Sequence, residues 1–301
     1  MGYHMRTEKR LTSLYQQAKV VTYSNTSKFV IMSDCHRGTG NWSDNFLPNQ
    51  NLFFAALQHY YDNGFTYIEL GDGDELWENR DFNHIVEVHS DAFWIMEKFY
   101  HNNRLYMLYG NHDIVKRNKK YVDKNMKKYY CDSKKKFCPL FPDLVVYEGL
   151  ILEHQDTYNS IFLVHGHQGD IINDELWPLG RFLVRYVWRR LELLGVKDPY
   201  SSDINPKKKN KIETQLSKWS DDHDQIIIAG HTHRAVFPGI REPKYFNDGS
   251  CVHPRCITAL EIENNAISLV KWSVLTKSDG SLYVGKTTLE GPVELPQYFV
   301  K

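Results

Sequence analysis

The sequence IIIAGHTH (residues 226–233) joins four apolar residues to two histidines, His231 and His233, that lie one residue apart. A short apolar run that stops abruptly at a glycine is typical of a buried strand that ends in a loop. At the end of such a strand both imidazoles can point into the same cleft. On its own this stretch is only suggestive, but four other apolar runs of the chain stop in the same way.

Each of these four runs ends in Asp, Asn or His, side chains that bind divalent cations. The run 28–33 is followed by Asp34 and His36, and the run 65–70 by Asp72. The run 104–109 is followed by Asn111 and His112, and the run 161–164 by His165 and His167. Helical segments at 52–61 and 83–100 separate the first three runs, as in the βαβ units of a largely parallel sheet. The residues after such strands meet at one edge of the sheet. We therefore predict a metal site there, rather than buried histidines that merely bond to backbone carbonyls.

The rest of the chain supplies the other expected elements. Residues 6–23 have roughly helical spacing and predict a short helix packed on the main body. A second helix is expected after the lysines at 207–209, with Ile212, Leu216 and Trp219 on one face. Residues 257–262 and 266–272 predict a β-hairpin, with Asn264-Asn265 as its tight turn.

The mixture of side chains indicates which ions the site prefers. Asp and His with a neutral Asn suit borderline cations such as Mn²⁺, Fe²⁺ or Zn²⁺ better than Mg²⁺, which favours oxygen and water. Seven or more candidate ligands exceed what one ion needs from protein. Two divalent ions that share a bridging carboxylate fit this number, with Mn²⁺ as our first expectation and Fe or Zn as alternatives.

The five motifs DxH, GDxxE, GNHD, HGH and GHTH occur here in the order in which calcineurin-like metallophosphoesterases carry them, so residues 28–273 resemble that superfamily. The resemblance implies an α/β fold, a four-layer α/β/β/α sandwich of two mixed sheets, formed by one domain over residues 1–301 with a helical cap insertion at 168–222.

The resemblance also implies a ligand set and a reaction. One ion is held by Asp34, His36 and His233, the other by Asn111, His165 and His231, with Asp72 bridging both. A hydroxide that bridges the metals attacks a phosphoester or pyrophosphate bond. His112, oriented by Glu75, donates to a phosphoryl oxygen or to the leaving oxygen.

The substrate is less well defined by the motifs. Phosphoprotein phosphatases carry Asp-Arg where this chain has Glu75-Leu76, and Glu in place of Asp113, which argues against a protein substrate. A helical excursion between the fourth and fifth motifs is similar to UDP-2,3-diacylglucosamine hydrolases, although those have Arg in place of His112. We expect a small nucleotide- or sugar-linked substrate. The candidate contacts are Arg37, His167, Arg181 and Arg185; the arginine stripe of the excursion is equally compatible with a surface helix whose arginines lie in water.

Composition limits the partners. The chain of 301 residues has 37 basic and 37 acidic side chains, so net charge offers no general basis for binding nucleic acid or an anionic membrane. The lysine-rich stretch 116–136 leaves two interpretations open, a nucleic-acid phosphodiesterase patch and a solvated helix face. A non-catalytic binding scaffold with the same fold is a further alternative. Five cysteines without paired spacing indicate reduced thiols, with Cys35 in packing. Without an apolar leader or a membrane-length segment, we expect a soluble cytoplasmic protein.

Overall fold

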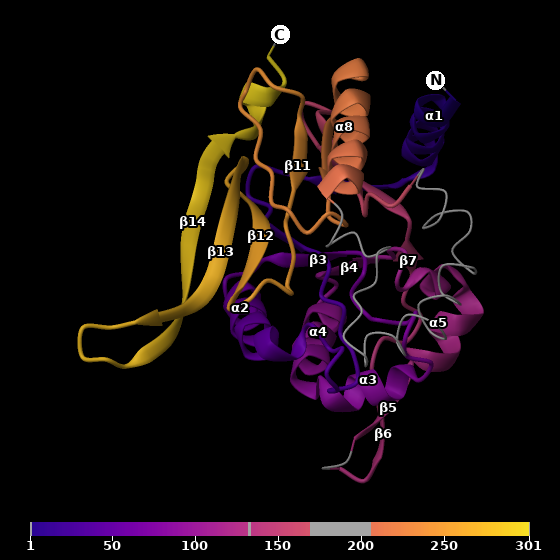
Figure 1. Cartoon of the computed structure of the whole chain (residues 1–301), viewed down its shortest axis with the longest axis vertical. Helices are drawn as coiled ribbons and strands as arrows, with labels where there is room; N and C mark the ends of the chain where they lie inside the picture. The colour runs from indigo at the N-terminus through magenta and orange to yellow at the C-terminus, as the bar shows by residue number, and fades with distance from the viewer. Residues whose placement is uncertain (1, 132–133, 169–205, 301) are drawn as a thin grey trace.

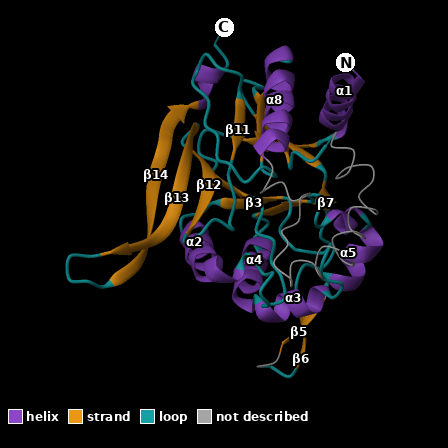
Figure 2. Ribbon diagram, viewed as in Figure 1, coloured by secondary structure: helices purple, strands orange, loops and turns teal. Residues whose placement is uncertain are grey.

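The computed structural model describes residues 2–131, 134–168 and 206–300. Within these residues two mixed β-sheets pack face to face, and helices cover the outer face of each sheet (Figure 1, Figure 2). The predicted four-layer α/β/β/α sandwich is therefore confirmed. Residues 169–205, which include Arg181 and Arg185 and most of the expected cap, lie outside the described residues.

The larger sheet has seven strands and carries three of the five motifs. In spatial order it consists of β14 (Leu282–Glu294), β13 (Ala266–Thr276), β12 (Cys256–Glu263), β2 (Phe29–Met32), β3 (Thr66–Leu70), β4 (Leu105–Leu108) and β7 (Val146–Tyr147). The strands β2, β3, β4 and β7 are parallel, as the βαβ pattern predicts, whereas β12, β13 and β14 run antiparallel. Asn264 and Asn265 have φ of 52° and 57°, so they form the predicted tight turn between β12 and β13.

The smaller sheet has five strands and carries the other two motifs. Its order is β1 (Lys19–Tyr23), β8 (Gly149–His154), β9 (Ser160–Val164), β10 (Ile226–Ala229) and β11 (Tyr245–Asn247). The strands β9, β10 and β11 are parallel, so their carboxyl ends lie at the same edge of the sheet. A separate hairpin is formed by β5 (Lys128–Cys131) and β6 (Lys136–Pro139).

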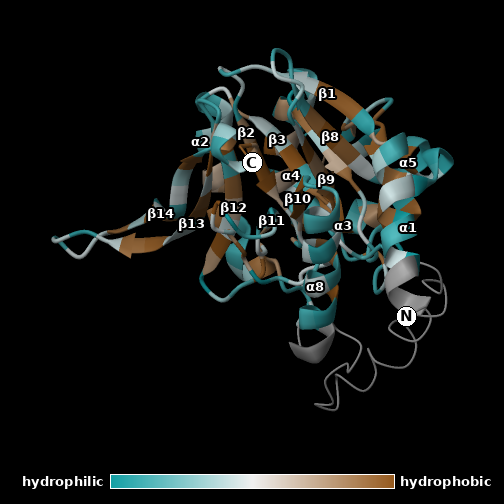
Figure 3. Cartoon of the chain, turned by 90° about the horizontal axis from the view of Figure 1, so that it is seen from above, coloured by the Kyte–Doolittle hydropathy of each residue, from teal (hydrophilic) through white to brown (hydrophobic). Residues whose placement is uncertain are grey.

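Alternation along β10 shows how the layers are filled. Ile226 and Ile228 point into the core between the two sheets, while Ile227 and Ala229 pack beneath the helices of the smaller sheet. Because both faces of the strand are buried, its sequence is apolar throughout. Figure 3 shows the same arrangement, with apolar strands inside and hydrophilic surfaces on the helices.

The helices fall into two groups. The larger sheet is covered by α2 (Gln50–Asp62), α3 (Phe82–Val88) and α4 (Ser90–His101), and the smaller one by α1 (Gly2–Gln17) and α8 (Pro206–Asp222). The short elements are α5 (Lys119–Asn125) and the 3-10 turns η1 (Leu47–Asn49), η2 (Ile114–Arg117) and η6 (Leu295–Tyr298). None of the helices in the described parts of the chain combines the length and apolarity that crossing a bilayer demands.

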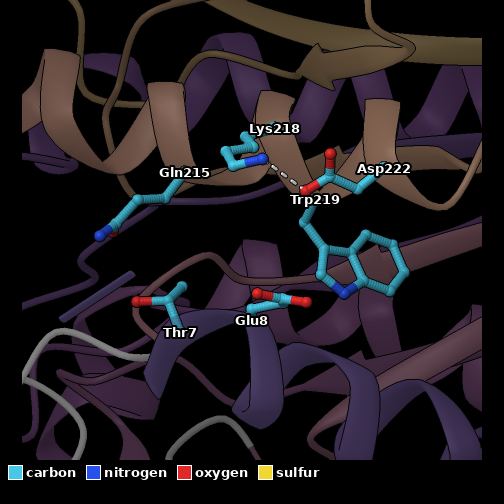
Figure 4. A pocket seen from close by; sticks show the side chains of 6 residues that line it. All are labelled: Thr7, Glu8, Gln215, Lys218, Trp219 and Asp222. Carbon is cyan, nitrogen blue, oxygen red and sulfur yellow. Dashed lines mark hydrogen bonds and ion pairs between the residues drawn. The ribbon is translucent and has the colours of Figure 1, made fainter. Parts of the chain in front are cut away.

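Helix α8, which lies within the expected cap segment 168–222, packs on the smaller sheet. Its predicted apolar face, Ile212, Leu216 and Trp219, is buried against strands of the smaller sheet. Its other neighbour is α1, where the side chains drawn in Figure 4 surround a small cavity and the Trp219 indole donates to the Thr12 hydroxyl at 3.0 Å. The helix is thus part of the outer layer of the sandwich.

Two further predictions of secondary structure are partly wrong. The segment 83–100 forms two helices because His89 leaves helical geometry and its Nε2 lies 2.9 Å from the buried Asp44 carboxylate. The segment 6–23 is helical only as far as Gln17. Its last residues, including Val20 and Val21, form β1 because they pair with β8.

Candidate metal centre

Five strands bring the predicted ligands to one place between the two sheets. The loops after β2, β3 and β4 carry residues from the larger sheet, and those after β9 and β10 carry residues from the smaller one. Three sets of three candidate side chains have ligand atoms within 4.8 Å of one another. The first group is Asp34 with His36 and His233, and the second is Asp72 with His165 and His231. A third set, His36 with Asp72 and His112, shares His36 with the first group and Asp72 with the second. The candidate ligands therefore form overlapping clusters that could hold metal ions.

In each group a carboxylate oxygen faces imidazole nitrogens. Asp34 Oδ1 lies 3.0 Å from His233 Nε2 and 3.6 Å from His36 Nε2. Asp72 Oδ2 lies 3.0 Å from His165 Nε2 in the second group and 3.9 Å from His36 Nε2 in the first. One oxygen of Asp72, Oδ2, therefore faces both groups, which is the position that a bridging ligand requires.

The other oxygen of each aspartate is held by the backbone. Asp34 Oδ2 accepts from the His231 N–H at 2.8 Å, and Asp72 Oδ1 accepts from the His112 N–H at 2.7 Å. Each carboxylate is thus fixed with its remaining oxygen turned into the centre. Outer hydrogen bonds of this kind orient ligands and raise metal affinity.

The backbone at the ligands adopts a conformation that side chains with a Cβ rarely take. Five ligand residues have positive φ, namely Asp34 (52°), His36 (48°), Asp72 (50°), His231 (65°) and His233 (54°). Left-handed geometry costs about 1–2 kcal/mol per residue, so the surrounding structure has to maintain it. Two backbone hydrogen bonds from the loop after β2 to the loop after β3 do so: the His36 N–H donates to the Asp72 carbonyl at 2.9 Å, and the Asp34 N–H donates to the Gly71 carbonyl at 3.1 Å.

Glycines in the motifs allow the loops to approach closely. A Cβ at Gly71 would lie 2.6 Å from His165 Nδ1, and one at Gly110 would lie 2.2 Å from Asp72 Oδ1. Both distances are far below a normal contact. The glycines of GDxxE and GNHD are therefore needed so that ligands from neighbouring strands fit side by side.

The donor atoms fit divalent cations. His165 Nδ1 lies 2.9 Å from the Leu70 carbonyl and donates to it, so Nε2 faces Asp72. The buried atoms Asn111 Oδ1 and His231 Nε2 have no hydrogen-bond partner in the described structure. A lone pair on His165 Nε2 that faces a carboxylate oxygen at 3.0 Å requires a positive charge between them, either a proton or a metal ion. Nitrogen and oxygen donors in this mixture suit Mn²⁺, Fe²⁺ or Zn²⁺.

Proton and metal should compete at this position, which gives a testable pH dependence. Burial lowers the pKa of His165, but the Asp72 and Asp34 carboxylates raise it by more, to about 9. Below that pKa the imidazole must lose a proton before it can bind a metal. We therefore expect the apparent Mn²⁺ affinity to rise with pH by up to about tenfold per unit for this proton and to level off above a pH of about 9. Calorimetric titrations in two buffers of different ionisation enthalpy would measure the released proton. An affinity that stays constant between a pH of about 6.5 and one of about 8.5 would contradict this expectation.

His112 lies beside the first group and is the most accessible imidazole of the centre. Its side chain is 23% exposed, and Nδ1 lies 2.7 Å from Glu75 Oε2, the predicted orienting contact. The same Glu75 oxygen lies 3.2 Å from His36 Nδ1, so one carboxylate holds both a ligand and His112. The Trp77 indole stacks on His112 with a centroid distance of 4.6 Å. Burial lowers the pKa of His112, but Glu75 and Asp72 raise it by more, which favours a proton on its ring.

Arg37 is a correction to the predicted substrate contacts. Its guanidinium is completely buried, with Nη1 2.7 Å from Glu69 Oε2 and Nε 2.7 Å from Asp74 Oδ1. An arginine that is buried and bound to two carboxylates does not face a surface from which a phosphate could reach it. The prediction is wrong because Glu69, inside an apolar strand, and Asp74 meet Arg37 beneath the centre.

The ion pairs around Arg37 extend to Lys116 and fasten the loops. Lys116 is buried, with Nζ 2.5 Å from Asp74 Oδ2 and 2.7 Å from Asp113 Oδ2. Asp113 in turn accepts from the backbone N–H of Gly110 at 2.7 Å and of Gly73 at 3.2 Å. This network therefore connects the loop that carries Asp72 and Glu75 to the loop that carries Asn111 and His112.

The same network weakens the interpretation of 116–136 as a nucleic-acid patch. Its first lysine, Lys116, is inside the protein, and Lys119 pairs with Asp123 at 2.9 Å. The stretch is also divided between η2, α5 and strand β5 instead of forming one helix face. The stretch therefore does not form the single solvated helix face that is the other interpretation, and its first lysine does not contribute to a surface patch.

His167 also differs from its prediction as a substrate contact. Its ring is completely buried, with centroids 5.5 Å from His165 and 6.5 Å from His231. Its ring thus lies next to two of the candidate ligand imidazoles and is not exposed. Cys35, between two ligands, is likewise buried among apolar side chains, as predicted.

Asp248 is a further buried carboxylate of the region that the predicted set does not contain. Asp248 directly follows β11 and is completely buried, with Oδ1 2.7 Å from the hydroxyl of Ser33. The sequence does contain a signal for it, because residues 245–247 are another short strand that stops at an acidic residue. That signal is weak, since the strand is short and contains a polar residue.

The geometry thus defines a class: an α/β/β/α sandwich with a buried cluster of Asp, His and Asn at its strand ends. No family model matches the sequence, and no curated protein sequence matches it. Among solved structures, the chain is similar to Vps29 of Chaetomium thermophilum, with a TM-score of 0.40 and 10% identity. That alignment covers 87% of this chain and 96% of the Vps29 chain. A likeness of this size adds nothing to the assignment of the centre, whose interpretation depends on its own residues.

Proposed function

We propose that this protein is a dinuclear metal-dependent hydrolase of phosphoester or pyrophosphate bonds. The observation that carries the proposal is the position of Asp72, whose Oδ2 faces a ligand group on either side. Asp34, His36 and His233 would hold one ion, and Asn111, His165 and His231 the other. Two divalent cations, when bound, supply the positive charge that attracts a phosphoryl group and makes attack by water possible at neutral pH.

The side chains of this chain would divide the remaining work between them. Glu75 holds Nδ1 of His112, so that Nε2 is free to hold a proton at the open side of the centre. From there His112 would donate to a phosphoryl oxygen or to the leaving oxygen. Cys35 is completely buried, which supports water and not this thiol as the attacking group.

The mixture of ligands supports Mn²⁺ as the first ion to test, with Fe and Zn as alternatives. The substrate that we propose is small and nucleotide- or sugar-linked. The burial of Lys116 and the pairing of Lys119 favour such a substrate over nucleic acid.

The test is reconstitution with defined metals. Protein stripped with a chelator should be inactive toward p-nitrophenyl phosphate and bis-p-nitrophenyl phosphate, and Mn²⁺ should restore turnover. Nucleotide sugars, cyclic nucleotides and phosphopeptides assayed beside them would identify the class of substrate. Full turnover in excess chelator would refute the proposal. Less than one metal equivalent by elemental analysis, with no activity on any ester, would favour a non-catalytic scaffold.

A further inference from the structure

Asp248 is a buried carboxyl group that the proposed reaction does not use. It lies at the carboxyl end of β11, beside the loop that carries Asp34, and it is completely buried. Its Oδ1 lies 2.7 Å from Ser33 Oγ, while its Oδ2 is buried without a hydrogen-bond partner in the described part of the chain. An ionised carboxylate in this position would leave one charged oxygen without any donor, which is costly in the interior of a protein.

The contacts of Ser33 determine where the protons are. Its hydroxyl lies within hydrogen-bond distance of two carboxylate oxygens, Asp34 Oδ2 and Asp248 Oδ1. A serine hydroxyl has one hydrogen, so it donates to one of them and must accept from the other. Asp34 Oδ2 already accepts the His231 N–H at 2.8 Å and therefore acts as an acceptor. The remaining donor is Asp248, as a neutral acid.

The charges around Asp248 also favour its neutral form. Burial raises the pKa of Asp248, and the negative charge of Asp34 raises it further. The hydrogen bonds then run in one direction, from the Asp248 acid to Ser33 Oγ and from the Ser33 hydroxyl to Asp34 Oδ2. Two donors on Oδ2 hold the Asp34 carboxylate so that Oδ1 faces His233 and His36.

We propose that Asp248 is a positioning residue for the metal centre, acting through Ser33 as the donor that fixes Asp34. This inference rests on the proposed function in one respect, namely that Asp34 is a metal ligand. A neutral Asp248 also leaves Asp34 and Asp72 as the two acidic ligands, so that two divalent cations bound there are only partly neutralised by the protein. The remaining positive charge is then directed toward a phosphoryl group.

The test is the Mn²⁺ affinity of the full chain, measured by calorimetry and by metal content after dialysis. Ser33→Ala and Asp248→Ala should each weaken binding by about 10- to 100-fold, the usual effect of removing an outer hydrogen bond to a ligand. Asp248→Asn should stay close to wild type, because its amide still donates to Ser33 without a charge. Ser220→Ala is the matched control. Ser220 is as buried as Ser33, but its hydroxyl donates to the Gln225 carbonyl at 2.7 Å. The Mn²⁺ affinity of this variant should therefore equal that of the wild type.

The outcomes separate this inference from the proposed function. Wild-type protein that binds no Mn²⁺ would overturn both. Two other results would overturn the positioning role alone, provided that the wild type binds Mn²⁺. One is an Asp248→Ala variant whose Mn²⁺ affinity equals that of the wild type. The other is an Asp248→Asn variant whose affinity is as low as that of Asp248→Ala. If Asp248→Ala does not fold, the infrared difference spectrum of metal-free wild type against Asp248→Asn decides. It should contain the carbonyl band of a neutral carboxylic acid, and its absence would refute the neutral Asp248.

Discussion

Asp72→Asn should lose both metal ions and lower turnover by about 1,000-fold, which corresponds to roughly 4 kcal/mol of lost transition-state stabilisation. The substitution keeps the shape of the side chain, so the effect follows from charge and from the choice of donor atom. Asp72 Oδ1 accepts the His112 N–H at 2.7 Å. In the Asp72→Asn variant the amide oxygen must keep that bond, and the NH₂ group is then turned toward His36 and His165, where it cannot bind a cation.

Metal content by elemental analysis and turnover with saturating Mn²⁺ measure the two parts of this prediction. Asp62→Asn is the matched control, because Asp62 is exposed at the end of α2, where its carboxylate accepts from Gln58 Nε2 at 2.8 Å. Its metal content and turnover should equal those of wild type. An Asp72→Asn protein that keeps two metal equivalents would show that Asp72 does not bridge the ions.

The positions of the ligands could be predicted because one rule governs all of them. Each ligand follows an apolar run, and the carboxyl ends of parallel strands meet at one edge of a sheet. The rule uses only the pattern along the chain, so it places Asp34, Asp72 and Asn111 together at the larger sheet, and His165 with His231 at the smaller one. It does not bring the two sheets face to face, which is what places His231 close to Asp72. It applies less clearly to Asp248, because the segment 244–251 predicts a strand that continues past this residue, whereas β11 ends at Asn247.

Contacts beneath the ligands could not be predicted in this way. Arg37 follows His36 and is therefore expected to bind a phosphate, but its direction depends on Glu69 and Asp74, two acidic residues on another strand and its loop. Nothing in the spacing of these residues shows that a cation will be buried between them. The link from Asp248 to Ser33 likewise joins residues 215 positions apart.

The wrongly predicted elements have local patterns that tertiary contacts override. His89 lies within a run that is helical on both sides, yet its contact with Asp44 interrupts the helix. Val20 and Val21 continue the helical spacing of α1, yet pairing with β8 places them in a strand. In both cases the deciding partner lies elsewhere in the sequence, so that a window of neighbouring residues cannot contain it.

His112→Asn should lower turnover by about 100- to 10,000-fold while metal binding is retained, because His112 would act on the substrate and not on the ions. Its Nδ1 is held by Glu75 Oε2 at 2.7 Å, and its ring is supported by Trp77. This leaves Nε2 to give a proton to the leaving oxygen. The loss should therefore be largest for alkyl phosphoesters, whose leaving oxygen needs a proton, and smallest for p-nitrophenyl esters, whose leaving group departs readily without one.

The comparison of leaving groups separates this role from a structural one. A variant that only disturbs the centre would slow all esters by the same factor and would lose metal. Glu75→Gln supplies a second comparison, because the same Glu75 oxygen also lies 3.2 Å from His36 Nδ1. It should weaken metal binding as well as turnover, whereas His112→Asn should affect turnover alone. If His112→Asn slows alkyl and p-nitrophenyl esters equally, His112 does not give the proton to the leaving oxygen. Its remaining role would then be to donate a hydrogen bond to a phosphoryl oxygen.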